Sequence, residues 1–466
     1  MASVQDFLTV FFGYKAYVML PIIMFVLALA ARLPLLQAVR STVALAAGFA
    51  GVFIAFNFFV ANISPAVQAL SLARGLSFPA LDVGWLPLAA ITWASPLAAI
   101  SIPLVLGLNL FMLAVGWTRA IYIDIWNYWH FALMGALAMT VFDNWWVGLS
   151  ATLLLAVYCF KMTEWNAPDV ERETGLPGIA ISPVSVNGTL PFVVCADWLM
   201  DRIPVLRNWN YNPERQPSAS ADQPLRHWLA LLGEPMVIGL LMGLLLGWAA
   251  SYTLQVTLEM GVNIAAVMFL LPKSAGLIGD AMIPITNALR QRVEQRFPNR
   301  KNLVVAMDTG FLMQHKSVIT TGLILMALAI VIALVLPGNQ VLPLGDLSNL
   351  ISIMSLSVLM FRGNVVRAVL AGIPVIVAFL LISSDMAHLY TELASKTPSF
   401  DTTGLGTITS FTDGGNPPRY VLYALYQGKL WAVAALALTL GGMVLARKRY
   451  QRAMQKALPL PTDTAA

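Results

Sequence analysis

Apolar stretches alternate with short polar loops along most of the chain. A helix needs about 20 apolar residues to cross the hydrocarbon core of a bilayer, and eleven stretches reach or approach that length. The pattern predicts an all-α, polytopic membrane protein with about eleven transmembrane helices, two of them short. We place the spans at 17–31, 42–62, 96–117, 125–141, 146–160, 228–250, 252–272, 317–337, 347–361, 368–385 and 428–446.

Two further apolar stretches, 178–200 and 404–425, contain residues that break a helix. Irregular backbone is tolerated at membrane depth only where it is buried in protein or lines a cavity. Each stretch therefore predicts two half-helices that meet at a polar tip, a re-entrant hairpin, with an ordinary loop as the alternative. The breaking residues are Pro183, Asn187, Gly188 and Pro191 in the first stretch and Asp413, Gly414, Gly415, Asn416, Pro417 and Pro418 in the second.

The segments 82–96 and 337–347 are also interrupted by glycine and proline. Each precedes a span, an arginine-containing loop, more apolar sequence and one of the suspected hairpins. Interrupted segments in corresponding positions of two halves point to the binding site of a transporter. An internal repeat that pairs these two segments is therefore one interpretation, although the two halves differ in their number of spans.

The composition agrees with this pattern. Hydrophobic residues make up 58% of the chain and charged residues 11%, against about 45–50% and about 25% in soluble proteins. The net charge of +5 does not indicate nucleic-acid binding, because the basic residues lie in short loops and near the C-terminus. Their distribution predicts an N-terminus outside and a C-terminus in the cytoplasm. Cys159 and Cys195 lie in apolar sequence, so neither a disulfide nor a metal site is expected.

The polar and aromatic residues at the interrupted segments are the candidate ligands. Asp82, Trp85, Trp93 and Ser95 surround the first break. Tryptophan faces stack on the C–H faces of sugars and polyols, and the indole N–H adds a donor. The alternative for a single tryptophan is an anchor at the membrane interface.

A second group enters the span at 125–141. Asn127 and His130 are three residues apart and would share one face of a helix, although His130 has a structural role as its alternative. No second histidine or cysteine has the spacing for a metal site. Asn339 and Gln340 add amides that match hydroxyl groups. Such side chains outnumber charges at these positions, which favours a neutral ligand over an ion.

In this order, the polar segments resemble the membrane component, enzyme IIC, of galactitol-type bacterial phosphotransferase systems. The matching segments are DVGW and TWAS within 82–95, TRAIYIDIWNYWH at 118–130, GIAI at 178–181, GEPMVIGLLMG at 233–243, PGNQVLPLGDL at 337–347, FRGN at 361–364 and TDGG at 412–415. The resemblance implies that a polyol or sugar crosses the bacterial inner membrane and is phosphorylated on the cytoplasmic side. The phosphoryl group would come from a separate soluble IIB protein, which a IIA protein recharges.

No motif for chemistry of the chain's own occurs, and no cofactor is expected. The chain would be the membrane subunit of a protein-Nπ-phosphohistidine–galactitol phosphotransferase. The related ascorbate-type components imply a homodimer whose protomers each have a scaffold and a mobile core that moves as an elevator. On this basis 1–466 is one membrane unit. Core elements are expected at 82–200 and 317–425, scaffold elements at 15–62, 228–272 and 428–450, and a polar tail at 457–466.

One departure concerns the first hairpin, where family members usually carry a Pro-His-Gly-Thr run. Gly188 and Thr189 match, but Asn187 stands in place of the histidine. An amide does not exchange a proton near neutral pH, so a role of that histidine in phosphoryl transfer would not be open to this chain. The substrate could then be another alditol, a pentitol or a hexose. The predicted ligand set is Asp82, Trp85, Trp93, Ser95, Asn127, His130, Asn187, Gly188, Thr189, Asn339, Gln340 and Asp413.

Two other functions stay open. The first is an ion-coupled secondary transporter of a polyol or sugar, in which Glu234 or Asp413 carries the coupling ion. The second is a structural or receptor membrane protein without transport.

Overall fold

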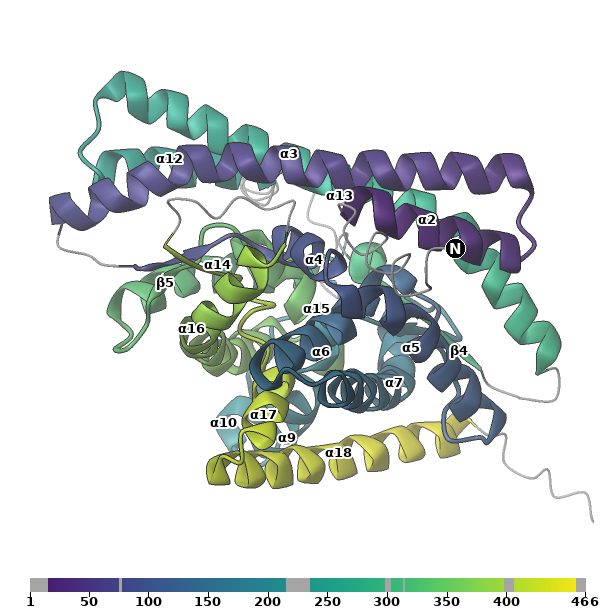
Figure 1. Cartoon of the computed structure of the whole chain (residues 1–466). Coiled ribbons are helices and arrows are strands. Elements are labelled where there is room, and N and C mark those ends of the chain that lie inside the picture. Colours follow the sequence, from purple (N-terminus) through teal and green to yellow (C-terminus); the bar gives the residue numbers. More distant parts are fainter. Residues whose placement is uncertain are drawn as a thin grey trace, which may run out of the picture.

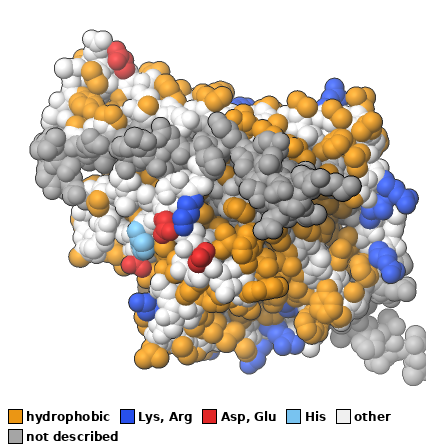
Figure 2. All heavy atoms as spheres, in the orientation of Figure 1, with side chains coloured by type: hydrophobic (Ala, Val, Ile, Leu, Met, Phe, Trp, Pro, Cys, Tyr) orange, Lys and Arg blue, Asp and Glu red, His pale blue; other side chains and the backbone are white. Residues whose placement is uncertain are grey.

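The computed structural model describes residues 16–74, 78–214, 235–297, 303–312, 315–397 and 406–457. Glu234 and the end of the polar tail lie outside these ranges. Within them the chain is mainly helical, and a helix covers part of each of the eleven predicted spans. Six of these helices are long and apolar enough to cross a membrane. Apolar side chains also predominate on the face drawn in Figure 2. The chain is a helical, multi-pass membrane protein.

Four helices form a layer along one side of the molecule (Figure 1). They are α2 (Ala16–Ala30), α3 (Leu35–Arg74), α12 (Pro235–Ala249) and α13 (Leu254–Arg296). Helices α3 and α13 approach closely at Gly48, where an added Cβ would lie 2.9 Å from the carbonyl oxygen of Ser274. Small residues permit this approach between membrane helices. The Asn263 Nδ2 atom also donates to the Asn62 Oδ1 atom at 2.7 Å, which fixes the register of the two helices.

The other elements form a second body beside this layer. Its first half contains β1 (Ala80–Asp82), α4 (Trp85–Trp93), α5 (Pro96–Ala114), β2 (Ala120–Ile121), η1 (Ile125–Tyr128), α6 (Trp129–Phe142), α7 (Trp145–Thr174), β3 (Ile179–Ile181), α8 (Val184–Asn187), α9 (Leu190–Met200) and α10 (Pro204–Asn208). Its second half contains β4 (Val304–Met307), η2 (Thr309–Leu312), α14 (Lys316–Val335), β5 (Val341–Leu342), η3 (Leu347–Asn349), α15 (Leu350–Met360), α16 (Val365–Ser395), β6 (Thr407–Thr409), α17 (Pro417–Tyr426) and α18 (Leu430–Ala457).

Within the described ranges, six short strands form two parallel sheets, which the expectation of an all-α fold did not include. One sheet has the order β5-β1-β6 and the other β2-β4-β3. The central strand of each sheet comes from the other half of the chain. This reciprocal exchange joins the two halves through backbone hydrogen bonds.

The two halves of the second body are an internal repeat. Helices α5 and α14 have 19 and 20 residues, and α7 and α16 have 30 and 31. Both α7 and α16 are preceded by an asparagine, Asn144 or Asn364. Its side-chain oxygen accepts hydrogen bonds from the backbone N–H groups two and three residues later. Such a cap satisfies donors that a helix start leaves unpaired. In this repeat, β4 is the equivalent of β1, β5 of β2, and β6 of β3.

This pairing corrects the repeat that the interrupted segments suggested. The segment 82–96 corresponds to the start of the second half, at β4 and η2, and not to 337–347. The segment 337–347 instead corresponds to the connection that contains β2 in the first half. Glycine and proline interrupt both segments, but they occupy different places in the repeat.

A charged cluster ties together the ends of α7, α9, α16 and α18. The Arg449 guanidinium contacts Asp169 and Asp197 at 2.8 Å each. The Arg367 guanidinium contacts Asp197 at 2.9 Å and Asp201 at 2.8 Å. Each arginine is thus paired, as charges withdrawn from water require.

Candidate substrate site

The carboxyl ends of four of the strands carry a polar residue. Asp82 ends β1, Asp308 follows β4, and Ser182 and Ser410 follow β3 and β6. Carboxyl ends of parallel strands are frequent binding positions, because the connections there carry free polar groups. The repeat therefore supplies two sets of equivalent groups to one place.

The first set, which we call the closed carboxylate pair, consists of Asp82 and Asp346. The Asp82 carboxylate accepts from the backbone N–H groups of Gly84 (3.1 Å), Asp346 (3.0 Å) and Phe411 (2.9 Å). The Asp346 carboxylate accepts from the Trp85 N–H group (3.2 Å) and the Ser410 hydroxyl (2.6 Å). Both carboxylates are buried. Their hydrogen-bonding capacity is used by the protein, so they position the strand ends.

The turn after Asp82 requires glycine. Gly84 has a φ of +79°, a conformation that residues with a Cβ rarely adopt. A Cβ at this position would lie 2.7 Å from the carbonyl oxygen of Gly345. The DVGW segment thus serves the close approach of two strand ends.

The second set, the open carboxylate pair, consists of Asp124 and Asp308. The Asn127 Nδ2 atom donates to both, at 2.7 Å and 2.8 Å. The Ser182 hydroxyl donates to Asp124 at 2.5 Å. Asp308 is exposed, and among the described residues it otherwise accepts only from its neighbour Thr309.

One residue explains why the two sets differ. Phe411, the second residue after β6, donates its backbone N–H group to Asp82. The second residue after β3 is Pro183, which has no N–H group to donate to Asp308. The repeat therefore leaves the Asp308 carboxylate available to another donor.

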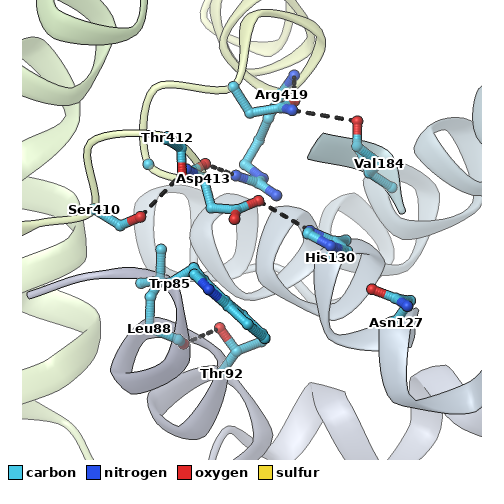
Figure 3. Close-up of polar contacts among 12 residues, drawn as sticks. Trp85, Leu88, Thr92, Asn127, His130, Val184, Ser410, Thr412, Asp413 and Arg419 are labelled. Carbon is cyan, nitrogen blue, oxygen red and sulfur yellow. Dashed lines mark hydrogen bonds and ion pairs between the residues drawn. The ribbon is translucent and has the colours of Figure 1, made fainter. Parts of the chain in front are cut away.

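A histidine and an aspartate meet between these sets (Figure 3). The His130 Nδ1 atom lies 3.4 Å from the Asp413 Oδ1 atom, and both side chains are buried. The His130 ring stacks on Trp129 with centroids 3.9 Å apart, and Trp129 stacks on Trp85 at 6.2 Å. Asn349 extends an amide toward Asp413 at 3.5 Å. Helix α6 and the loop after β6 thus present an imidazole, a carboxylate and an aromatic wall.

Several buried polar atoms of the described residues here have no hydrogen-bond partner. Buried polar groups are normally paired, and exceptions are frequent where a ligand binds. A ligand rich in hydroxyl groups would supply both donors and acceptors to such atoms. Near His130 they are Trp129 Nε1, Arg419 Nε and Arg419 Nη2, and at the end of α4 they are Trp93 Nε1 and Ser95 Oγ. The His130 Nδ1 and Asp413 Oδ1 atoms have each other, but at a long 3.4 Å.

The residues of the first broken stretch have a different place. Asn187 is fully buried. Its Nδ2 atom donates to the carbonyl oxygens of Ile181 (2.8 Å) and Ser182 (3.1 Å), and its Oδ1 atom accepts from Asn166 (2.8 Å). The Thr189 hydroxyl donates to the carbonyl oxygen of Val186. These side chains shape the turn after β3.

Replacing Asn187 by alanine is expected to lower the free energy of unfolding by about 2–3 kcal/mol, because two buried carbonyl groups and the Asn166 amide lose partners. Unfolding by sodium dodecyl sulfate in mixed micelles measures this change. Ser185→Ala, two residues earlier, serves as the control and should change stability by less than about 1 kcal/mol. Equal effects of the two substitutions would contradict the positioning role of Asn187.

Gly188 lies where the two broken stretches meet. An added Cβ would be 3.1 Å from the Asn416 Nδ2 atom and 3.2 Å from the Pro418 Cδ atom. Asn339 and Gln340, in contrast, precede β5, whereas the site lies beyond its other end. The Asn339 Nδ2 atom donates hydrogen bonds within the turn before β5, to the carbonyl oxygens of Ala333 (2.9 Å) and Val341 (2.8 Å). The structure does not bring Asn339 or Gln340 to His130.

The sequence interpretation missed Asp308 and Arg419. Asp308 belongs to the segment DTGF at 308–311, which repeats DVGW at 82–85. The segment GDLSN at 345–349 likewise repeats IDIWN at 123–127. These two pairs were the available signal. Arg419 follows two prolines and has no comparable pattern. Among the described residues, no cluster of histidine, cysteine and acidic side chains could hold a metal ion.

Comparisons with known proteins agree with this geometry. The family model described as "PTS system sugar-specific permease component", where PTS is the phosphotransferase system, matches residues 10–404. The "PTS system galactitol-specific EIIC component" of Escherichia coli (strain K12) is 30% identical over 410 residues, 88% of each chain. A "Putative permease IIC component" of the same strain is 29% identical over 433 residues, 93% of this chain and 97% of that protein.

Proposed function

The chain belongs to the family of sugar-specific permease components, EIIC, of the phosphotransferase system, and we propose that it carries a neutral alditol. Galactitol is the first candidate, because a relative with 30% identity is named for it. The observation that carries the proposal is the long His130–Asp413 contact and the free donors of Arg419 beside stacked tryptophans. This combination suits the hydroxyl groups and C–H faces of a polyol.

We assign distinct roles to the side chains of this site. Asp308 and Asp413 accept hydrogen bonds from substrate hydroxyls, and Arg419 donates to them. Trp85 and Trp129 cover one face of the carbon chain. His130, Asn127 and Asn349 hold the carboxylates in position. Asp82, Asp346 and Asn187 support the strand ends from behind.

The partners follow from group translocation. A soluble IIB protein would phosphorylate the alditol on the cytoplasmic side, and a IIA protein would recharge IIB. Phosphorylation makes uptake one-way, because a charged ester does not return through a site for a neutral ligand. The chain supplies binding and positioning, and the phosphoryl chemistry belongs to IIB.

We propose that the segments 179–200 and 407–426 are the two re-entrant hairpins, and that the protein works by an elevator motion. Each segment is a strand, a tight turn and a short helix, and the turns meet at Gly188. The layer of α2, α3, α12 and α13 would be the scaffold and the homodimer contact. Helix α18, expected in the scaffold, packs against α9, α17 and α7, so we place it with the moving core. For the rest of the chain we propose the boundaries expected from the sequence, with core elements at 82–200 and 317–425 and about eleven transmembrane helices.

The orientation is proposed from the charges. Arg447, Lys448 and Arg452 are exposed near the end of α18, beside the cluster of Arg367 and Arg449. Basic residues gather on the cytoplasmic side, which puts the C-terminus inside and the N-terminus outside a bacterial inner membrane.

Transport into vesicles tests this function against an ion-coupled transporter. Vesicles that contain the protein, the IIA and IIB proteins and a phosphoryl donor system should accumulate galactitol phosphate. Omission of IIB should abolish accumulation. Uptake of unmodified galactitol driven by a proton or sodium gradient, without IIB, would replace the proposal by the ion-coupled alternative.

A further inference from the structure

Arg419 is a buried cation whose donors are only partly used. Its side chain is 1% exposed. The Nη1 atom donates to the backbone carbonyl oxygen of Asp413. The Nε and Nη2 atoms have no hydrogen-bond partner, and no carboxylate in the described part of the chain forms an ion pair with the guanidinium. Figure 3 shows the side chain extending from α17 toward Asp413 and His130.

The two free donors lie along one edge of the planar guanidinium group. Nε–H and Nη2–H point in nearly the same direction and form the fork that binds two oxygens of one carboxylate or phosphate group. The Asp413 carboxylate attracts the guanidinium from beyond ion-pair distance, but it does not occupy the fork. The two free donors of this buried cation therefore suit an oxyanion.

The backbone holds this fork in place. The Arg419 N–H group donates to the Asn416 Oδ1 atom at 3.2 Å, which caps α17. The Asn416 amide also reaches the carbonyl oxygen of Val184, at 3.5 Å, across the contact between the two turns. The guanidinium thus lies at the junction of both turns and beside the proposed alditol site.

A neutral alditol does not use the charge of Arg419 fully, but its phosphorylated form does. We propose that the Arg419 fork binds the phosphate group of the phosphorylated product, so that the site holds both the alditol and its phosphate ester. The inference rests on the proposed function. Its consequence is that the product competes with the substrate for the purified protein, without IIB.

Competition binding on the purified full-length protein tests the proposal. Labelled galactitol is the reporter, and unlabelled galactitol, galactitol 1-phosphate and inorganic phosphate are the competitors. For the wild-type protein, galactitol 1-phosphate should compete at least as well as galactitol. Arg419→Lys keeps a positive charge but loses the fork, and Arg419→Gln loses both. In each variant, the affinity for galactitol 1-phosphate should fall by about tenfold or more relative to the affinity for galactitol.

Arg367→Lys is the matched control, because Arg367 is also buried but pairs with Asp197 and Asp201, away from His130. It should leave the ratio of the two affinities unchanged. Because Arg419 also donates to substrate hydroxyls, galactitol affinity should fall too, but less than the affinity for the ester. Equal fold-losses of both affinities in the Arg419 variants would show a general role and overturn the assignment. The wild-type protein alone also tests the assignment. Binding of galactitol without binding of galactitol 1-phosphate would overturn it. The proposed function fails separately, if the wild-type protein binds no galactitol.

Discussion

Replacing Asp82 by alanine is expected to destabilise the protein far more than replacing Asp308, although the two residues occupy equivalent positions in the repeat. Asp82→Ala leaves the buried N–H groups of Gly84, Asp346 and Phe411 without an acceptor. Each costs about 1–3 kcal/mol, so the free energy of unfolding should fall by about 3–9 kcal/mol. Detergent-induced unfolding in mixed micelles measures this loss.

Asp308→Ala should show the reverse result. The exposed Asp308 carboxylate bonds one amide beyond its own neighbour, that of Asn127, which also bonds Asp124, so its loss should cost less than about 1.5 kcal/mol of stability. Galactitol affinity should fall by about tenfold or more, because a charged acceptor of a substrate hydroxyl is lost. Asp82→Asn, which keeps one carbonyl oxygen, should lie between wild type and Asp82→Ala in stability. Equal stability losses for Asp82→Ala and Asp308→Ala would contradict the distinction between the closed and open pairs.

Replacing Asp413 by alanine is expected to abolish most galactitol binding. The Asp413 carboxylate is buried, and its Oδ1 atom lies 3.4 Å from the His130 Nδ1 atom, a distance too long for a strong hydrogen bond. A hydrogen bond to a charged group contributes about 2–3 kcal/mol, which corresponds to about a 30- to 150-fold loss of affinity. Equilibrium binding of labelled galactitol measures it directly.

Asp385→Ala provides the matched control for this substitution. The Asp385 carboxylate accepts from the Tyr420 hydroxyl at 2.8 Å, but it lies on α16 outside the proposed site. It should leave galactitol affinity within about threefold of wild type, since substitutions away from buried contacts have small effects. Equal losses in the two variants would mean that Asp413 acts through the fold rather than on the substrate.

The helices could be predicted because their signal is long. A membrane span needs many consecutive apolar residues, so α5, α14 and α16 follow from the sequence alone. The six strands could not, because two to four residues carry no readable alternation. In the sequence, their buried residues, such as Ile121 and Ile181, look like part of an apolar loop. The two sheets exist because the repeat exchanges its central strands, which is a tertiary effect.

Five of the predicted ligands could be identified because polar residues cluster near a helix. The structure gathers Asp82, Trp85, Asn127, His130 and Asp413 in one region, and the roles that we assign to them there are a proposal. The repeat was paired wrongly from proline and glycine in 82–96 and 337–347. These residues mark turns, and turns occur at non-equivalent as well as equivalent positions of a repeat.

The residues that were missed lacked such a context. Asp308 lies in a segment that hydropathy marks only as a polar connection, and the short DTGF segment was its one signal. Arg419 has a charge that, in a single sequence, is typical of an exposed loop. Only the packing of α17 against both turns buries it.

The most direct measurement of the central claim is a structure of the protein with galactitol bound. The account predicts the ligand between the open carboxylate Asp308 and the Asp413 carboxylate, with Arg419 and His130 in contact and Trp85 beside its carbon chain. A ligand bound elsewhere would contradict it. The clearest case would be galactitol in the largely apolar cavity of about 390 Å³ that lies between α9, α16, α17 and α18.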